Sequence, residues 1–390
     1  MKILIVTYGL NTAGGLQAWQ HMFSHELIKR GHNLTIMEMY DYSNLYEEKK
    51  VVRSWNEKIK IIRENGNIIQ RGINLNTTID ALKVMMNYSK KRQYSLMLKK
   101  EKFDVILFTD PNFTFHFFEK TIKNNNCFVQ FHNSFERFMT TSKIRYHLIK
   151  HKIKSFKKFI LLSQGDVDNA IKNGFQPEKL TYVTNFINEK KFLEYRKDYS
   201  LKSKIILIVS MLSSKDKQVD HVLKAFSLIE KRISKDWKIK IIGEGKIKYE
   251  LIELCNKLDI RDNVEFVGQK DNPIEDFFGS DFFVLSSSYE GFPLTLLECV
   301  FSNLPIIAYE CSPSIKNIVT DGFNGLIVAR NNIKSLADAM ASLILNSDKV
   351  KFFSQNQEKI KEKFVTNNVI NMWEALFSEF VNIKDNLCEK

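Results

Sequence analysis

Cysteine is scarce in this sequence, and no two of its five cysteines form a Cys-x-x-Cys pair. Such pairs are typical of zinc sites, and regularly spaced cysteines are typical of small disulfide-stabilised domains. The scattered thiols therefore argue against both and favour a reducing cytoplasm. The cysteines are Cys127, Cys255, Cys299, Cys311 and Cys388.

Long apolar runs are also missing. No stretch approaches the roughly 18–20 apolar residues that a membrane-spanning helix needs. The apolar start Met1–Val6 is too short for a signal peptide, and we interpret it as the first strand. There is also no G-x-G-x-x-G fingerprint, because Gly9 and Gly14 have the wrong spacing and Gly243-x-Gly245 lacks a third glycine.

The charge of the chain is strongly positive. Lysine and arginine number 58 against 45 acidic residues, which gives a formal charge of +13. Such an excess points to an anionic partner, although a solvated lysine-rich surface explains it equally well. No zinc finger, aromatic-rich RNA-binding motif or heptad repeat accompanies the charge, so we expect no nucleic-acid partner.

One short segment gathers seven cations and no acidic residue. Apolar residues such as Ile149, Ile153 and Phe156 alternate with the cations, which is typical of a basic amphipathic helix. We interpret the segment as a surface for an anionic membrane or for the acceptor of a reaction. The seven cations are Lys143, Arg145, Lys150, Lys152, Lys154, Lys157 and Lys158.

Short apolar runs alternate with amphipathic stretches, as in a parallel, doubly wound α/β sheet. The alternation predicts two domains, residues 1–190 and 191–367, with a helical insertion over residues 41–100. Ligands of such sheets bind beyond the carboxyl ends of the strands, so a cleft between the domains is expected to hold them. The expected strands are residues 2–7, 33–38, 104–109, 127–131, 159–163, 205–210, 238–242, 264–267, 282–285 and 305–308.

The nine residues Glu290–Glu298 carry the clearest chemical pattern. They follow an expected strand and a serine-rich loop, and Pro293 suits the first position of a helix. A helix start presents unpaired N–H groups and a partial positive charge, which favour a phosphate. Glu290 on the loop and Glu298 one turn into the helix then flank the anion and accept from hydroxyl groups, which is the layout of a sugar nucleotide.

Three further features follow expected strands. Gly14 and Gly15 open the first helix and allow close approach of a ligand, although an ordinary loop has the same composition. His132 ends a strand and points at the cleft, where it binds a hydroxyl or phosphate or is simply structural. Lys217, with its neighbour Lys215, suits a diphosphate as a point charge, unless both are surface lysines.

The segment Ser286–Glu298 resembles the P-S-x-x-E-G-[FL]-[GP] motif and E-x(7)-E pair of the retaining GT-B glycosyltransferases of family 4, with Ser286 replacing the usual proline. Asp321–Leu326 looks like the family's D-G-x-N-G-L turn, and Val183–Ile187 like the start of its interdomain linker. The resemblance implies two Rossmann-like domains facing each other across a cleft. It also implies that a last helix, about residues 368–390, returns to the amino-terminal domain.

The resemblance implies roles for the matching residues. Glu290 contacts the donor sugar, Glu298 the ribose, and Lys217 the diphosphate, while His132 lies near the transferred sugar. His132, Glu290 and Lys217 are thus the expected catalytic residues. The expected donor-binding residues are Gly14, Gly15, Lys215, Lys217, Gly243, Glu290, Gly291, Phe292, Pro293, Leu294, Thr295 and Glu298.

One position departs from the family pattern. Met211 stands where the family has an arginine, and the loss of one charge-assisted contact costs about 1.5–3 kcal/mol. Lys215 is a candidate to compensate. Otherwise the chain is a slow enzyme or a non-catalytic partner subunit of a glycosyltransferase complex. A GT-B-fold sugar-nucleotide epimerase is a further alternative.

The sequence thus predicts a retaining hexosyltransferase that uses a nucleotide sugar, best a UDP-sugar. The expected acceptor is a glycan or lipid-linked molecule of polysaccharide, lipopolysaccharide or teichoic acid assembly, bound by the amino-terminal domain. No metal or other cofactor is expected, because Lys217 and the helix dipole stabilise the leaving diphosphate. The expected location is cytoplasmic, with attachment to the inner face of the plasma membrane as an option.

Overall fold

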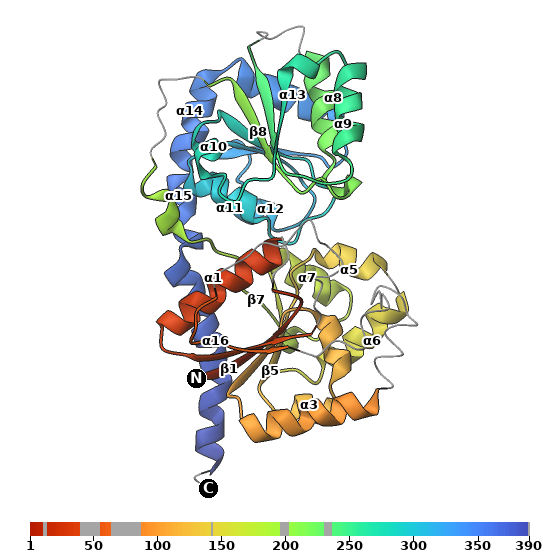
Figure 1. The fold of residues 1–390 in the computed structure, drawn as a ribbon, viewed down its shortest axis with the longest axis vertical. Coiled ribbons are helices and arrows are strands. Elements are labelled where there is room, and N and C mark those ends of the chain that lie inside the picture. Colours follow the sequence, from red (N-terminus) through yellow and green to blue (C-terminus); the bar gives the residue numbers. More distant parts are fainter. Residues whose placement is uncertain are drawn as a thin grey trace. The chain divides into compact units, whose positions relative to one another are not determined.

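The computed structural model describes residues 1–10, 14–39, 55–63, 87–141, 143–195, 203–229 and 236–388. The chain divides into two compact units (Figure 1). The amino-terminal unit comprises Met1–Asn185 and Asn367–Lys390, and the carboxyl-terminal unit comprises Phe186–Thr366. The sequence placed these boundaries at residues 190/191 and about 367/368, five residues and one residue away.

The amino-terminal unit is built on a seven-stranded sheet in the order β3-β2-β1-β4-β5-β6-β7, with every neighbouring pair parallel. Its apolar runs are buried on both faces, as parallel sheets require. The strands are β1 (Lys2–Thr7), β2 (Asn33–Glu38), β3 (Lys60–Arg63), β4 (Val105–Phe108), β5 (Cys127–Gln130), β6 (Lys158–Leu161) and β7 (Leu180–Tyr182).

Two helices from opposite ends of the sequence cover one face of this sheet. These are α1 (Gly15–Lys29) and α16 (Thr366–Cys388). Trp373 of α16 lies 5.1 Å from the Phe23 ring of α1, and Phe377 lies 5.2 Å from Phe128 of β5. The returning helix therefore packs on the amino-terminal unit, as the apolar stripe of its sequence requires.

The opposite face of the sheet carries the remaining helices of this unit, such as α5 and α6 in Figure 1. Alternate strand residues, including Ile106, Phe108 and Val129, enter this second core. The helices are α3 (Tyr88–Glu101), η2 (Pro111–His116), α4 (Glu119–Lys123), α5 (Phe135–Thr141), α6 (Lys143–Ile153), α7 (Gln164–Lys172) and the short turn η3 (Pro177–Lys179).

The prediction of a helical insertion over residues 41–100 is wrong in part. Residues 40–54 and 64–86 lie outside the described residues, and Tyr88–Glu101 is helical. Lys60–Arg63, however, is an edge strand that pairs with β2. Its apolar core is only the pair Ile61-Ile62, which is too short to show strand periodicity in the sequence. The three-residue strand β7 escaped prediction for the same reason.

The carboxyl-terminal unit repeats the architecture with six parallel strands in the order β10-β9-β8-β11-β12-β13. The first five expected strands of this unit appear within one residue of their predicted ends, because they are long apolar runs between clear turn signals. The strands are β8 (Ile205–Val209), β9 (Lys238–Ile242), β10 (Val264–Gly268), β11 (Phe282–Leu285), β12 (Ile306–Tyr309) and β13 (Gly325–Val328).

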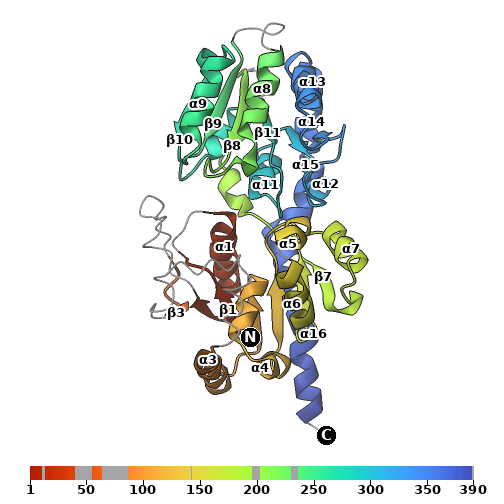
Figure 2. The same cartoon turned by 90° about the vertical axis from the view of Figure 1, so that its right-hand side faces the viewer.

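Helices cover both faces of the second sheet (Figures 1 and 2). One group packs around α8, with α9 and α13, and the other around α11, with α10, α12 and α15. The helices are η4 (Glu189–Phe192), η5 (Lys215–Lys217), α8 (Val219–Ile229), α9 (Lys248–Lys257), η7 (Arg261–Asn263), α10 (Ile274–Phe278), α11 (Leu294–Phe301), α12 (Ile315–Ile318), α13 (Ile333–Ile344), α14 (Ser347–Asn356), α15 (Glu358–Lys361) and η8 (Glu362–Phe364).

Candidate functional site

Two predicted catalytic residues meet at the carboxyl edge of the second sheet. Lys217 follows β8 and Glu290 follows β11, and these two strands are parallel neighbours. Lys217 Nζ lies 2.7 Å from Glu290 Oε1, and the two side chains are 33% and 13% exposed. The pair is therefore partly shielded but still open to a ligand.

Hydrogen bonds join the two loops that carry this pair. Ser286 Oγ donates to the carbonyl oxygen of Lys217 at 2.9 Å. The backbone N–H and the hydroxyl of Ser288 both donate to the carbonyl oxygen of Asp216, at 2.7 and 2.9 Å. The sequence indicated only a polar serine loop here. The structure shows that these serines hold the backbone of Lys217 beside that of Glu290.

Helix α11 begins next to the pair. Pro293, with φ −68° and ψ 117°, is the N-cap residue and not the first helical residue as predicted, because its backbone is extended. Leu294 and Thr295 then form the first turn, where N–H groups have no acceptor within the helix. Phe292 is buried, with its ring 5.7 Å from Phe364, so its side chain anchors the turn in the core. Gly291 is buried beside it.

Glu298 lies on α11, beyond its first turn. Burial raises the pKa of this carboxyl group to about 7, and the positive charge of Lys191 opposes the rise. A carboxylate with few partners is costly inside a protein. Hydroxyl groups that donate to Glu298 would relieve this cost, which suits the predicted contact with a ribose.

The backbone amide of Gly243, a predicted donor-binding residue, is engaged within the protein. Its N–H donates to the carbonyl oxygen of Gly268 at 2.8 Å. Its φ is 146°, and a Cβ atom there would lie 1.8 Å from the carbonyl oxygen of Ser210. Glycine is therefore needed for the close packing of this loop on Ser210.

Lys215 also lies apart from its predicted place. It is an exposed residue, and its Nζ lies 2.9 Å from Glu250 of α9. Met211 stands where the family has an arginine, and Lys215 was the candidate to compensate for that difference. The Met211 side chain is 41% exposed. Lys215 therefore pairs with Glu250 in this structure, and its contact with a diphosphate stays a prediction.

His132, the third predicted catalytic residue, belongs to the amino-terminal unit. It follows β5, and its ring lies 4.5 Å from that of Trp19 in α1. Its Nε2 atom is buried and has no hydrogen-bond partner among the described residues. Burial lowers the pKa of His132 to about 3. The imidazole is therefore neutral at physiological pH and can exchange hydrogen bonds with a hydroxyl group.

Gly14 and Gly15 stand at the start of α1, the helix that contacts His132. Gly14 is the N-cap residue, and its carbonyl oxygen accepts the N–H of Ala18 at 3.1 Å. Gly15 is the first helical residue. The described geometry thus gives an exposed helix start without a side chain, which leaves room for a ligand beside the backbone N–H groups.

The basic segment forms helix α6, and most of its apolar residues face the protein core, although Ile144 is 58% exposed. Ile149, Ile153 and Phe156 are at most 2% exposed. Arg145 Nε donates to Asn112 Oδ1 at 2.8 Å, and burial lowers the pKa of Lys152 to about 8. Hydrogen bonds to backbone carbonyl oxygens also hold Lys150, Lys152 and Lys158.

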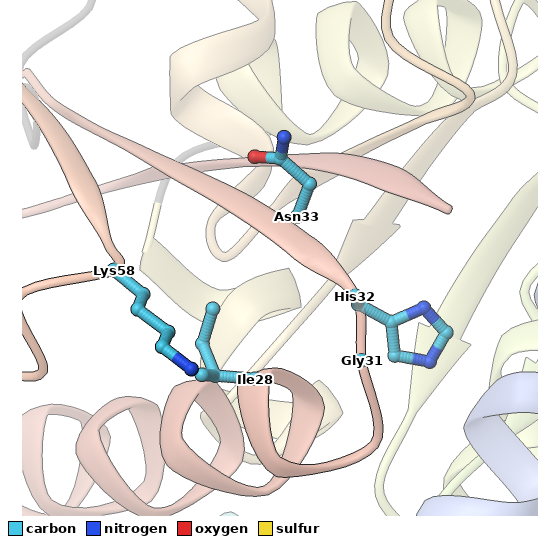
Figure 3. A pocket seen from close by; sticks show the side chains of 5 residues that line it. All are labelled: Ile28, Gly31, His32, Asn33 and Lys58. Carbon is cyan, nitrogen blue, oxygen red and sulfur yellow. The ribbon is translucent and has the colours of Figure 1, made fainter.

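A cavity of about 340 Å³ opens in the amino-terminal unit (Figure 3). The His32 ring points away from Lys58, and its Nε2 atom lies 2.8 Å from Glu374 Oε1 of α16. The cavity lies at the amino end of β2, opposite the carboxyl ends of the strands, so we do not assign a substrate to it. Its lining residues are Ile28, Gly31, His32, Asn33 and Lys58.

Two searches of the described residues were negative. Every described helix is either too short or too polar to span a bilayer. Within the same ranges, no group of three or more His, Cys, Asp or Glu side chains could hold a metal ion.

Two Rossmann-like units define the GT-B fold, and comparison with solved structures agrees. The structure of S. aureus TarM with fondaparinux, alpha-GlcNAc-glycerol and UDP matches this chain with a TM-score of 0.74 at 16% identity. The match covers 97% of this chain and 100% of the other. The chain therefore has the GT-B fold.

Comparison of sequences gives a match for the carboxyl-terminal unit: residues 191–360 match the model of glycosyl transferases group 1. An uncharacterized glycosyltransferase of Haemophilus influenzae is 30% identical over 198 residues, 51% of this chain and 56% of that protein. The poly(ribitol-phosphate) alpha-N-acetylglucosaminyltransferase of Staphylococcus aureus is 25% identical over 291 residues, 72% of this chain and 57% of that protein. The chain thus spans little more than half the length of these relatives.

Proposed function

We propose that the chain is a glycosyltransferase and that its carboxyl-terminal unit binds the nucleotide-sugar donor. The observation that carries this proposal is the contact of 2.7 Å between Lys217 and Glu290, beside the first turn of α11. A cation and a helix start favour a diphosphate, and a carboxylate accepts from sugar hydroxyls. The match of residues 191–360 to glycosyl transferases group 1 supports the same assignment.

In this proposal the bound donor separates Lys217 from Glu290. Without a ligand, Lys217 and Glu290 satisfy each other's charge. When the donor binds, Lys217 turns to the diphosphate, the Leu294 and Thr295 N–H groups donate to its oxygens, and Glu290 accepts from the sugar. The leaving diphosphate then gains charge next to fixed donors, which is electrostatic stabilisation of the transition state.

We infer a retaining enzyme of family 4 with front-face transfer. Lys217 holds the Glu290 carboxylate, so the proposal gives Glu290 no role as a nucleophile. In the proposed step, the acceptor hydroxyl oxygen bonds to the anomeric carbon as the bond from that carbon to the phosphate oxygen breaks. The hydroxyl proton passes to the leaving phosphate oxygen, so no protein base is needed. His132 then binds a sugar hydroxyl as a neutral imidazole.

A UDP-sugar is the proposed donor, and a glycan or lipid-linked acceptor of cell-surface polymer assembly is the proposed acceptor. The similar S. aureus TarM structure holds UDP, and the S. aureus relative is a poly(ribitol-phosphate) glycosyltransferase. We propose that the acceptor binds the amino-terminal unit, where His132 and the Gly14–Gly15 helix start lie, and that no metal takes part.

Ligand binding tests the proposal most directly. UDP-, GDP- and ADP-sugars are screened by thermal shift, and the best ligand is then measured by calorimetry. We expect a UDP-sugar to stabilise the chain and Glu290→Ala to abolish transfer. If no nucleotide binds, the proposal is wrong and a non-catalytic partner subunit, the alternative raised by Met211, replaces it. Conversion of the donor sugar without any acceptor would instead identify an epimerase.

A further inference from the structure

Arg330 is a cation at the proposed donor site that sequence patterns did not single out. It follows β13, and its Nη1 atom lies 3.3 Å from the carbonyl oxygen of Ser288. Its guanidinium carbon lies 5.3 Å from the centre of the Tyr289 ring. Ser288 and Tyr289 immediately precede Glu290, so Arg330 packs on the loop that carries the donor-sugar carboxylate.

The sheet explains why such distant residues meet. Strands β11, β12 and β13 are parallel neighbours, so the segments after them emerge at one edge. Cys311, which follows β12, is influenced by charged residues from the loops around it. Burial raises the pKa of its thiol to about 12; the Glu290 carboxylate adds to the rise, and the positive charges of Lys217 and Arg330 oppose it. A hydrogen bond of 2.8 Å from Gln218 Nε2 to Asn331 Oδ1 further ties the Lys217 loop to the Arg330 loop.

A second cation at this edge would help to neutralise a bound diphosphate. Lys217 is neutralised by Glu290 before the ligand arrives, and Met211 carries no charge. A nucleoside diphosphate is a multiply charged anion, and the planar guanidinium fork fits phosphate oxygens better than a lysine does. Contacts to a carbonyl oxygen and an aromatic ring hold Arg330 on the same group of loops and fix its direction.

We propose that Arg330 binds the donor's diphosphate and supplies the positive charge that Met211 does not. This inference rests on the proposed function, since it names a further binding residue of the same site. The ligand class is a nucleoside diphosphate, whether free or as part of a nucleotide sugar.

Arginine 261 offers a matched control. It belongs to the same unit and also contacts a carbonyl oxygen and an aromatic ring, with Nη1 2.8 Å from Val264 O and its guanidinium carbon 5.9 Å from the Phe266 ring centre. It precedes β10, however, and so lies at the opposite edge of the sheet from Glu290. Arg261→Gln therefore removes the same kind of contacts without touching the proposed site.

The experiment measures binding of UDP and of uridine, which has no phosphate, by calorimetry at low salt. We expect Arg330→Gln to weaken UDP binding about 10- to 100-fold, the loss of one charge-assisted contact. Uridine binding should stay within twofold, Arg330→Lys should lose less than Arg330→Gln, and Arg261→Gln should bind UDP like the wild type. Unchanged UDP binding by Arg330→Gln overturns the inference, as does an equal loss for UDP and uridine, which indicates loop damage.

A second variant tests whether Arg330 takes over the role of the family's arginine, where this chain has Met211. Met211→Arg in the Arg330→Gln background should recover at least tenfold of the lost UDP affinity, and no recovery would contradict the substitution. Failure of the proposed function is distinct from failure of this inference. In the first case the wild type binds none of UDP, GDP and ADP; in the second the wild type binds UDP and the Arg330 variants bind it equally well.

Discussion

The carboxyl edges of the two sheets differ sharply in charge. At the edge of the second sheet, Lys217 and Glu290 form an ion pair of 2.7 Å with Arg330 nearby. At the edge of the first sheet, burial opposes charge. It lowers the pKa of His132 to about 3 and raises the pKa of Asp110, although a hydrogen bond from the Asn112 backbone and the charge of Arg145 oppose the rise at Asp110.

This difference indicates that the two similar units bind two different kinds of ligand. Cations at the edge of the second sheet neutralise the negative charge of a diphosphate. A charged ligand therefore offsets the free energy lost when the ion pair breaks. An edge where burial opposes charge favours hydroxyl groups, because neutral hydrogen bonds discriminate by geometry and not by charge. The contrast supports placing the donor on the carboxyl-terminal unit and a hydroxyl-bearing acceptor on the amino-terminal unit.

The largest effect is expected from Glu290→Gln, which removes the negative charge from the charged edge. We predict that transfer falls about 100- to 1,000-fold, because a contact that strengthens in the transition state is lost. Binding of UDP, which lacks the transferred sugar, should become about two- to fivefold tighter, because Lys217 no longer has a competing carboxylate. Transfer assays and calorimetry measure the two quantities on the same protein.

Glu250→Gln is the matched control for that change. Glu250 pairs with the exposed Lys215 at 2.9 Å, so this variant also removes an acid from an ion pair. Both transfer and UDP binding should stay at wild-type values. Weaker UDP binding by Glu290→Gln would contradict the idea that the ion pair competes with the donor.

Glu298 gives the next largest effect, on stability. Burial raises its pKa to about 7, so between pH 4.5 and 7 the folded chain binds more protons than the unfolded chain. Stability is therefore lost as pH rises through this window, by up to about 3 kcal/mol. Glu298→Gln should raise the midpoint of unfolding at pH 8 and leave it unchanged at pH 4.5. A variant less stable than the wild type at pH 8 would refute the burial argument.

The same carboxyl group predicts a pH dependence of binding. Ribose hydroxyls donate to the carboxylate form, so UDP affinity should rise from pH 6 to pH 8 in the wild type. In Glu298→Gln the affinity should be lower and should not change in this way. Calorimetry at both pH values checks it, and equal slopes in the two proteins would remove Glu298 from the ribose site.

The sequence predicted the parts of this molecule that depend on local patterns. The strand residues 282–285 were correct to the residue, and the positions of Glu290 and Lys217 after strands placed both at one site, where the structure shows them in contact. Arg330 was not found, because it meets Tyr289 only through the order of strands β11, β12 and β13, which periodicity does not reveal. The sequence also does not show that the amide of Gly243 is bonded to the carbonyl oxygen of Gly268.

The next prediction concerns His132, at the edge where burial opposes charge. Its pKa of about 3 means that the unfolded chain, but not the folded chain, binds a proton below pH 6.5. Stability should therefore fall as pH drops from 6.5, by at most about 1.4 kcal/mol per pH unit. NMR of the imidazole ring should show it neutral at pH 5, and His132→Gln should flatten the stability slope and reduce transfer about tenfold.

His116 is the control for His132, because burial also lowers its pKa to about 3 and it lies in the same unit. His116→Gln should flatten the stability slope in the same way but leave transfer at the wild-type rate. A His132 ring that titrates near pH 6.5 would show that the first edge carries charge after all, and the contrast between the edges would then fail.

The smallest effect is expected from Ser286→Ala, which acts on the charged edge without touching any charge. The Ser286 hydroxyl donates to the carbonyl oxygen of Lys217 at 2.9 Å, and the loss of one neutral hydrogen bond costs about 1 kcal/mol. If that bond positions Lys217 for phosphate, UDP binding should weaken about fivefold while uridine binding stays the same. Ser227→Ala removes a hydroxyl that donates to Lys224 O at 2.8 Å, away from the site, and should leave both unchanged. An equal loss of UDP and uridine binding in Ser286→Ala would show that the serine supports the loop as a whole and not the lysine.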